Sequence, residues 1–286
     1  NVSGEGSVTA VTAGGGTFKT IDASTNTGGV NLEVADTAQN FAITGGAGND
    51  EITFTDVTNL TKDDIIDLGA GNDTLASKGT LDVSTEAKAA ILGGVSNVET
   101  LKVVGAALSA NGDFVAQNSF VADENGASVA LTNVANNGNL SFLDGDFTTA
   151  STVAMKLGAN TLNVELKGDK SDEANVIGTG AAGDGLTVTG SSTINLSSLG
   201  EAGVAANVLD LTAADNQSIV ITGDKDLTLN NAAGTGTTGF SIDASDFTGK
   251  LVVTGTAASD IIVGGSGDDT ITGGAGADTM TGGAGK

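Results

Sequence analysis

The sequence predicts an all-β protein, a parallel β-solenoid (β-roll) with small irregular β-insertions and one short helix. Three observations predict this fold class. The C-terminal residues repeat in nines, short β-prone runs follow one another through the rest of the chain, and the composition suits thin strands joined by tight turns. Among 286 residues there are 44 glycines and nine phenylalanines, but no proline, cysteine or tryptophan. This composition does not fit a helical bundle.

The chain is long enough for one large or two medium domains. We predict four regions along it. They are an N-terminal β-domain at 1–104 with two repeat-like turns and the short helix, an irregular β-insertion at 105–160, a β-solenoid at 161–254, and a roll of nine-residue repeats at 255–286 that is cut off at its end.

The N-terminal region opens with four short β-prone runs separated by Gly or Asn clusters. They lie at 7–12, 17–22, 30–34 and 41–44. A spacing of about eleven residues suits a solenoid or a sandwich. Two repeat-like turns follow, GGAGNDEIT from Gly45 and LGAGNDTLA from Leu68, and in the second of them Leu68 replaces the opening glycine.

Residues 54–67, between these two turns, are interpreted as an insertion in which 61–64 opens one helical turn. Its acidic residues are Asp63, Asp64 and Asp67. We interpret them as caps of that turn, because Asp readily accepts hydrogen bonds from nearby backbone N–H groups. Metal binding is the alternative.

The strongest helix signal lies at 84–93, with Ser84 as the N-cap and Gly93 as the end of the helix. A strand is predicted directly after it, within 94–103. Its inward-facing residues are expected to be Val98, Leu101 and Val103.

Residues 105–160 have a less regular pattern and contain four of the nine phenylalanines, Phe114, Phe120, Phe142 and Phe147. We interpret this region as a small β-subdomain or a wide insertion on the solenoid. The phenylalanines are expected to form a local core, because large aromatic side chains are usually buried. A partner-binding face is the alternative.

From residue 161 onward the predicted strands follow closely. They lie at 162–166, 186–189, 193–196, 208–211, 218–222, 227–230, 239–243 and 251–254. Most are not separated by hairpin dipeptides such as Asn-Gly, which favours a parallel solenoid over an antiparallel sandwich. Asn230, Asn231 and the Thr/Asn-rich turns are candidates for stacked side-chain ladders.

The repeats at 255–286 are GTAASDIIV, GGSGDDTIT and GGAGADTMT, followed by GGAGK. Aspartate occupies the sixth place of each complete nine, at Asp260, Asp269 and Asp278. An apolar residue occupies the eighth, at Ile262, Ile271 and Met280. Glycines permit a tight turn, and the last three places form a short strand whose eighth residue points inward.

Two nines make one coil of a parallel roll, so residues eighteen apart stack at about 4.8 Å. Asp260 and Asp278 are then expected on one edge and Asp269 on the other. Carboxylates stacked this closely repel one another unless a hard cation lies between them, bound also by turn carbonyls. Oxygen ligands without His or Cys indicate calcium, Ca²⁺.

The candidate calcium-binding residues are the sixth-place aspartates and the glycines of their turns. They are Asp260, Asp269, Asp278, Gly265, Gly267, Gly274, Gly276, Asp50, Gly46, Gly48, Asp73, Gly69 and Gly71. For the isolated copies at Gly45 and Leu68 the alternative is a glycine-rich hairpin turn with a solvated aspartate.

The nines resemble the GGxGxDxUx repeat of the RTX family, whose members are exported by type I secretion. The match is close over 264–281, whereas Thr256 and Ala258 replace two glycines in the first nine. That first turn is expected to bind weakly or only to cap the roll. The segment GVSNVETLKV at 94–103 resembles a strand that recurs in RTX-type surface-layer (S-layer) proteins.

The resemblance implies an extracellular protein of the bacterial cell surface. Calcium sites with affinities on the order of 10⁻⁴–10⁻³ M would be empty in the cytosol and full outside. RTX proteins carry an uncleaved C-terminal secretion signal. Because the sequence stops inside a repeat at Lys286, we expect that signal to lie beyond it.

The missing residue types argue against several functions. Without His, Cys, Arg or Tyr there is no Ser-His-Asp triad, Cys-His pair, HExxH zinc site or arginine clamp, so we expect no enzyme activity. A net charge of −24 with eleven scattered lysines excludes nucleic-acid binding by phosphate neutralisation. No apolar run approaches the roughly 20 residues of a membrane span.

The leading hypothesis is a structural S-layer or S-layer-like protein. It would be secreted by a type I system, fold on binding extracellular calcium and assemble laterally with copies of itself into a sheet or filament. One alternative is an RTX adhesin or matrix protein that binds a glycan, such as cell-surface polysaccharide, or a cell. Another is the calcium-folding C-terminal region of a secreted exoenzyme.

Overall fold

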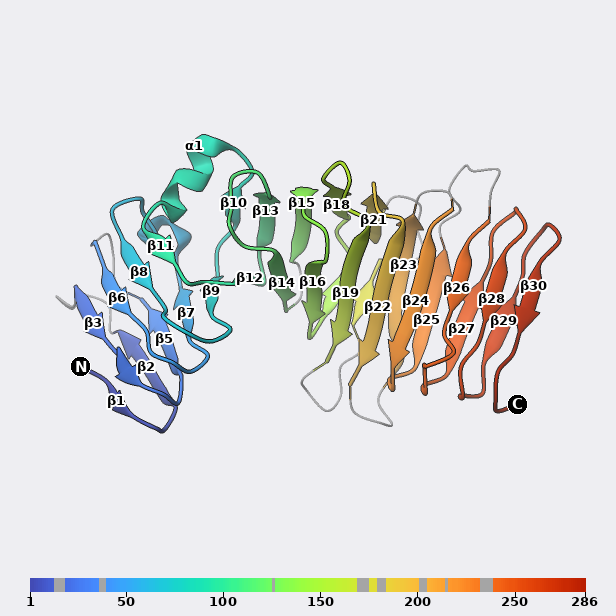
Figure 1. Cartoon of the computed structure of the whole chain (residues 1–286), viewed down its shortest axis with the longest axis horizontal. Coiled ribbons are helices and arrows are strands. Elements are labelled where there is room, and N and C mark those ends of the chain that lie inside the picture. Colours follow the sequence, from blue (N-terminus) through green and yellow to red (C-terminus); the bar gives the residue numbers. More distant parts are fainter. Residues whose placement is uncertain are drawn as a thin grey trace. The chain divides into compact units, whose positions relative to one another are not determined.

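The computed structural model describes residues 1–12, 19–35, 40–124, 127–168, 175–178, 184–200, 205–213, 216–231 and 239–286. They form two compact units, Asn1–Ala122 and Asp123–Lys286. Each unit is a parallel β-solenoid, in which strands from successive coils lie side by side in register (Figure 1). The predicted fold class is confirmed.

The first unit contains two main sheets. One has the order β2 (Val8–Thr12), β5 (Val30–Val34), β7 (Glu51–Phe54), β9 (Thr74–Ser77), β12 (Thr100–Val104) and β14 (Ser119–Asp123). The other has the order β11 (Val95–Ser96), β8 (Ile65–Asp67), β6 (Ala42–Thr44) and β3 (Thr20–Asp22). Two smaller pairs are β1 (Ser3–Gly4) with β4 (Thr25–Asn26), and β10 (Leu81–Val83) with β13 (Ala107–Asn111).

The core of the first unit is a column of inward-facing aliphatic residues. Leu32 pairs with Ile52, Ile52 with Leu75, and Leu75 with Leu101. All four are at most 3 % exposed. The predicted inward positions Val98, Leu101 and Val103 are buried, which confirms that interpretation. Alternation of buried and exposed positions is what a strand with one core-facing side requires.

Helical structure in the first unit is short. The helix α1 spans Glu86–Ala89 and continues as the 3₁₀ turn η2 (Ala90–Leu92), which ends at Gly93 as predicted. Its N-cap is Thr85, whose hydroxyl accepts the N–H of Lys88; the prediction of Ser84 was wrong. Ser84 instead donates to the carboxylate of Asp82.

Within 54–67 a second 3₁₀ turn, η1, occupies Val57–Asn59, upstream of the helical turn predicted at 61–64. The residues that follow it belong to the solenoid, because β8 pairs with β6 and β11.

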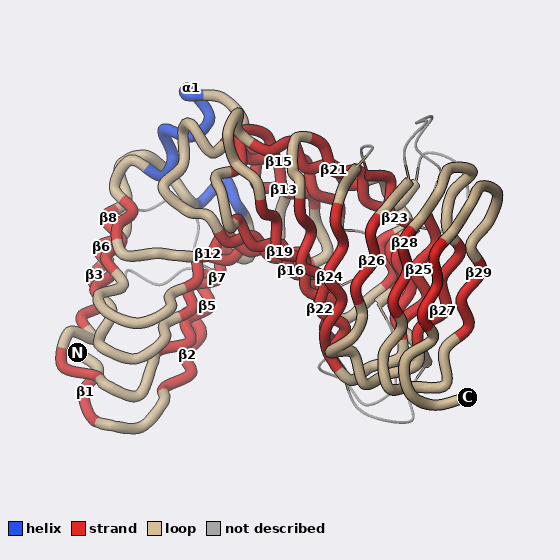
Figure 2. The backbone as a smooth tube through the Cα atoms, turned by 45° about the vertical axis from the view of Figure 1, so that its right-hand side comes forward, coloured by secondary structure: helices blue, strands red, loops and turns tan. Residues whose placement is uncertain are grey.

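The second unit has two facing series of strands (Figure 2). The first is β16 (Gly138–Leu143), β19 (Thr161–Lys167), β22 (Thr193–Leu199), β24 (Ser218–Gly223), β26 (Ser241–Asp243), β28 (Ile261–Val263) and β30 (Thr279–Thr281). The second is β15 (Ser128–Val134), β18 (Ser151–Met155), β21 (Leu186–Thr189), β23 (Asn207–Ala213), β25 (Leu227–Asn231), β27 (Leu251–Thr254) and β29 (Thr270–Thr272). The short strands β17 (Asp146–Phe147) and β20 (Val176–Ile177) pair with each other, and β20 also pairs with β23.

Coils shorten toward the C-terminus of this unit. Asn163 and Asn195, which are neighbours on β19 and β22, are 32 residues apart, whereas Asp260 and Asp278 are 18 apart. The eighteen-residue coil predicted for the nines is therefore confirmed. Ile262 pairs with Met280 across this coil.

Residues 105–160 contribute the strands β13 to β18. Phe120, Phe142 and Phe147 are buried, and the rings of Phe142 and Phe147 meet edge to face at 5.0 Å. The predicted aromatic core is confirmed for these three, whereas Phe114 is 43 % exposed.

Two predictions fall partly outside the described residues. These are positions 17 and 18 of the strand predicted at 17–22, of which β3 covers Thr20–Asp22, and the side chain of Asn231. Among the helices that the structure describes, none has the length and apolar character needed to cross a membrane.

Candidate calcium site

The three C-terminal aspartates lie where each turn ends and its strand begins. The register of β28 with β30 places Asp260 and Asp278 on the same edge of the second unit, and the N–H of Asp260 donates to Oδ1 of Asp278 at 3.0 Å. Asp269 precedes β29, which belongs to the opposite series of strands. This is the predicted arrangement.

Each of these carboxylates holds two coils together. In Asp269, Oδ1 accepts the N–H of Leu251 in the preceding coil at 2.9 Å, and Oδ2 accepts the N–H of Gly265 at 2.8 Å. Asp260 makes the same pair of bonds to Phe240 and Thr256, at 2.7 and 2.6 Å. An ionised carboxylate has about four acceptor sites, so each oxygen of Asp269 keeps capacity for a further ligand. In Asp260 the Thr256 hydroxyl also lies 3.1 Å from both oxygens, which leaves less capacity there.

The upstream copy at Gly45 repeats this geometry. Asp50 is 2 % exposed; its Oδ1 accepts from Val30 at 2.7 Å and its Oδ2 from Gly46 at 2.8 Å. The isolated position of this copy in the sequence does not alter its local structure. The alternative of a hairpin turn with a solvated aspartate is wrong here, because the carboxylate is buried between parallel strands.

Carboxylate and carbonyl oxygens converge at the first glycine of these turns. A Cβ placed on Gly264 would collide with Oδ2 of Asp269 and with the carbonyl oxygen of Gly282, eighteen residues further on. A Cβ on Gly255 would meet Asp260 Oδ2 and the Gly273 carbonyl in the same way. Only hydrogen fits there, so this place in the turn requires glycine. The carboxylate and carbonyl oxygens of these turns are hard donors of the kind that Ca²⁺ takes.

Comparison with known families agrees with this geometry. Residues 42–54, 61–77 and 254–286 match the RTX calcium-binding nonapeptide repeat, in four copies. The chain therefore contains RTX calcium-binding repeats. The comparison with curated proteins gave no match, and neither did the comparison with solved structures. The RTX match does not include 94–103, so the S-layer resemblance of that strand stays a prediction.

The remaining glycines predicted for the RTX turns lie against the backbone of the preceding coil. A side chain on any of them would strike it: Gly46, Gly48, Gly69, Gly71, Gly265, Gly267, Gly274 and Gly276. Gly274 and Gly276 also have φ of +94° and +111°, which other residues rarely adopt. Their role as carbonyl ligands stays a prediction. The carbonyl oxygens of Gly46 and Gly265 each already accept one backbone N–H, from Ala70 and Ala284, and each retains a second lone pair.

Asp73 departs from the pattern of the other RTX turns. It is fully buried, and its Oδ1 accepts the N–H of Asp50 at 2.7 Å, but its Oδ2 has no hydrogen-bond partner. Gly69, which should donate to it, bonds to Asp67 instead. The cause lies in the first place of the turn, where Leu68 buries a full side chain in the position that glycine holds elsewhere.

Burial raises the pKa of Asp73 to about 6, and the negative charges of Asp50 and Glu99 act in the same direction. An unpaired buried carboxylate oxygen between like charges is an unfavourable arrangement that a bound cation would relieve. The residues of this turn therefore also fit a calcium ion.

Two carboxylates have a linking role that the sequence analysis did not assign. Glu99 accepts the N–H of Asp73 at 2.8 Å, and so extends the column formed by Asp50 and Asp73. Asp64 accepts the N–H of Phe41 at 2.7 Å and that of Thr61 at 2.6 Å. Asp64 thus closes the turn at 61–64, but the prediction that it caps a helical turn there was wrong, because the 3₁₀ turn lies at Val57–Asn59 and Asp56 caps it. Their position in the sequence could have indicated this role, because Glu99 directly precedes β12 and Asp64 directly precedes β8.

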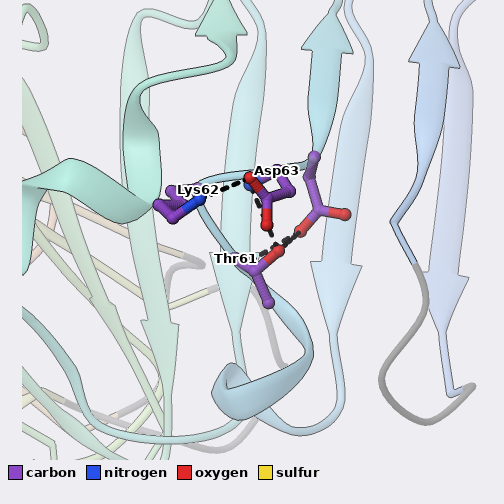
Figure 3. Close-up of polar contacts among 4 residues, drawn as sticks. Thr61, Lys62 and Asp63 are labelled. Atoms are coloured by element: carbon purple, nitrogen blue, oxygen red, sulfur yellow. Dashed lines mark hydrogen bonds and ion pairs between the residues drawn. The ribbon is translucent and has the colours of Figure 1, made fainter.

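The neighbouring Asp63 is part of a local surface network (Figure 3). Its Oδ1 pairs with Lys62 at 2.6 Å, and its N–H donates to the hydroxyl of Thr61 at 3.3 Å. These contacts lie within one turn, so they indicate a local structural role for Asp63.

No group of three or more His, Cys, Asp or Glu side chains converges as a metal site within the described residues. Calcium at an RTX turn of this chain would thus depend on one or two carboxylates together with backbone carbonyls. Such oxygen-only sites are suited to Ca²⁺, which takes six to eight oxygen ligands.

Proposed function

We propose that this RTX-repeat protein is a structural protein of the bacterial cell surface, of the S-layer or S-layer-like type. After type I secretion its repeats fold on binding extracellular calcium, and the folded chains assemble laterally into a sheet or filament. The observation that carries the calcium step is the match of 254–286 to the RTX calcium-binding repeat, in which Asp260 and Asp278 stack eighteen residues apart on one edge.

Linkage explains why folding would follow calcium. An ion that binds only the folded coil stabilises it by RT ln(1 + [L]/Kd), about 2.7 kcal/mol when free calcium is one hundred times Kd. Bound calcium also supplies positive charge between carboxylates of a chain whose net charge is −24. The chain's own groups, the sixth-place carboxylates and turn carbonyls, hold the ion and orient one coil on the next.

A structural role is further supported by the regular outer surface of the second unit. Asn139, Asn163 and Asn195 stack in register on β16, β19 and β22, and their side-chain amides are linked by hydrogen bonds of 2.9 Å. This is a stacked side-chain ladder, but it lies on exposed strand positions and at other asparagines than the ladders predicted inside the solenoid. A fixed, repetitive polar face of this kind suits contacts between identical copies. The absence of His, Cys, Arg and Tyr supports a role without catalysis.

The test is to purify the chain in chelator, titrate calcium to about 10 mM, and follow circular dichroism together with electron microscopy. We expect β-structure to increase and regular sheets or filaments to appear. Magnesium at the same ionic strength is the control for screening of charge. Folding without assembly would contradict the proposed lateral assembly and favour a monomeric adhesin. A glycan-binding assay would then test the adhesin function. No response to calcium would contradict the whole proposal.

A further inference from the structure

The groups that link one coil to the next differ along the second unit. In its first coils three such links among the described residues end on neutral side chains. The N–H of Val129 donates to the hydroxyl of Ser151 at 3.1 Å, that of Gly145 to Asn175 Oδ1 at 3.2 Å, and that of Asn175 to Asn207 Oδ1 at 3.0 Å. In the last coils the acceptors at the same kind of position are the carboxylates Asp260, Asp269 and Asp278.

Asn207 shows what a neutral link achieves. It is 1 % exposed, and while its Oδ1 accepts an N–H, its Nδ2 donates to the Ser198 hydroxyl at 3.0 Å and toward the carbonyls of Leu166 and Leu199 at 3.4 Å. An amide carries both a donor and an acceptor, so it satisfies nearby carbonyl oxygens by itself. A carboxylate has no donor, and carbonyls beside it need a cation.

Carboxylates do occur in these first coils, and Asp210 is a buried example. Its Oδ1 accepts from the side-chain amide of Asn230 at 2.7 Å. Asn230 is a neutral side-chain donor, and Asp144 is a second buried carboxylate of these coils.

The apolar core changes in the same direction. β19 is seven residues long and buries Leu162, Val164 and Leu166 at no more than 1 % exposure. β28 is three residues long and buries only one side chain, that of Ile262. Fewer buried side chains per coil provide less hydrophobic stabilisation.

We infer that the neutral segment, the described residues between 128 and 213, folds and remains folded without calcium, and that calcium orders the acidic coils at 239–286. This rests on the proposed function in one respect, that calcium binds the RTX turns. The neutral segment then provides a preformed sheet edge on which the acidic coils add one after another. In a solenoid, where each coil contacts its neighbours, such stepwise addition is expected.

The test is peptide-resolved hydrogen exchange of the full chain, first in chelator and then in calcium. Peptides from 251–281 are expected to gain protection in calcium, about 100-fold at one hundred times Kd, while peptides from 138–167 and 186–199 are protected equally in both. Limited proteolysis in chelator should leave a resistant fragment that contains 138–199.

The outcomes separate this inference from the proposed function. Loss of protection along the whole unit in chelator overturns the inference but leaves calcium-dependent folding intact. Equal protection of all peptides with and without calcium overturns both. Protection of the acidic coils but not of the neutral segment in chelator also overturns the inference.

Discussion

Replacement of Asp269 tests whether one carboxylate both links two coils and binds calcium. Asp269→Asn keeps an oxygen that can accept the N–H of the buried Leu251, but places an NH₂ group opposite the N–H of Gly265. Asp269→Ala removes both acceptors. The pair therefore separates one lost bond from two at the same position.

The magnitudes follow from these bonds. A hydrogen bond to a charged group contributes about 1.5–3 kcal/mol, so the Asn variant is expected to lose that amount and the Ala variant about 3–6 kcal/mol. Because about 1.4 kcal/mol corresponds to a factor of ten, exchange of the peptides from 251–281 should accelerate about 10- to 150-fold in Asp269→Asn in calcium. The calcium concentration at half-protection should rise in both variants, since each removes a negative ligand.

Hydrogen exchange is the appropriate assay because the chain lacks Trp and Tyr, and because a repeat array need not unfold in two states. Asp243→Asn is the matched control. Asp243 is an exposed carboxylate of the same unit, whose Oδ1 accepts from Ser245 two residues away. We expect it to change stability by less than about 0.5 kcal/mol. If Asp269→Asn shifts the calcium midpoint no further than Asp243→Asn, Asp269 does not bind calcium.

Three further predictions concern single positions. Gly264→Ala should raise the calcium midpoint and destabilise the last coils by about 1–3 kcal/mol. Gly282→Ala is the control, because a Cβ there meets no atom within 4 Å and should have neither effect. Equal effects of the two variants in exchange experiments would refute the convergence of oxygens at Gly264. In chelator the first unit should lose stability as pH rises from about 4 to about 6. The reason is that the pKa of Asp73 in the folded chain is raised to about 6, so its carboxyl group keeps a proton that the unfolded chain has released. The urea concentration at half-unfolding should show this pH dependence in the wild type and not in Asp73→Asn. Asn207→Asp should make the hydrogen-exchange protection of the neutral segment depend on calcium. Asn207→Ala should weaken that protection equally with and without calcium. Identical responses of the two variants would show that the Asn207 amide does not replace a bound cation.

Strand positions in the solenoid were accessible to sequence reasoning because alternation and turn residues are local signals. The predicted strands at 186–189 and 251–254 coincide with β21 and β27. Pairing partners were accessible only where the repeat fixed them, as for Ile262 and Met280. Elsewhere coil length varies, so neither the register of Leu162 with Ile194 nor the membership of 105–160 in the same sheets could be read from spacing.

Prediction of the site was limited because a motif does not determine the contacts that each aspartate makes with neighbouring coils. The motif identifies Asp50 and Asp73 as equivalent, yet Asp50 accepts two N–H groups and Asp73 leaves one oxygen without a partner. The difference arises from Leu68, which the sequence analysis recorded as a substitution without foreseeing its consequence. Glu99 was missed because it belongs to no repeat and meets Asp73 only through the coil register.

The sixth-place aspartate links two coils and is proposed to bind calcium, and the requirements of these two roles conflict when calcium is absent. As a link between coils it lies at least partly buried, and Asp260 is only 1 % exposed. Backbone N–H groups bond best to an ionised oxygen. Burial of that charge beside carbonyl oxygens is costly unless a cation shares the space. Asn207 shows that the fold has a neutral solution to the same linking problem. Aspartate at Asp260, Asp269 and Asp278 is therefore what the proposed calcium dependence requires, because an amide would link the coils without calcium.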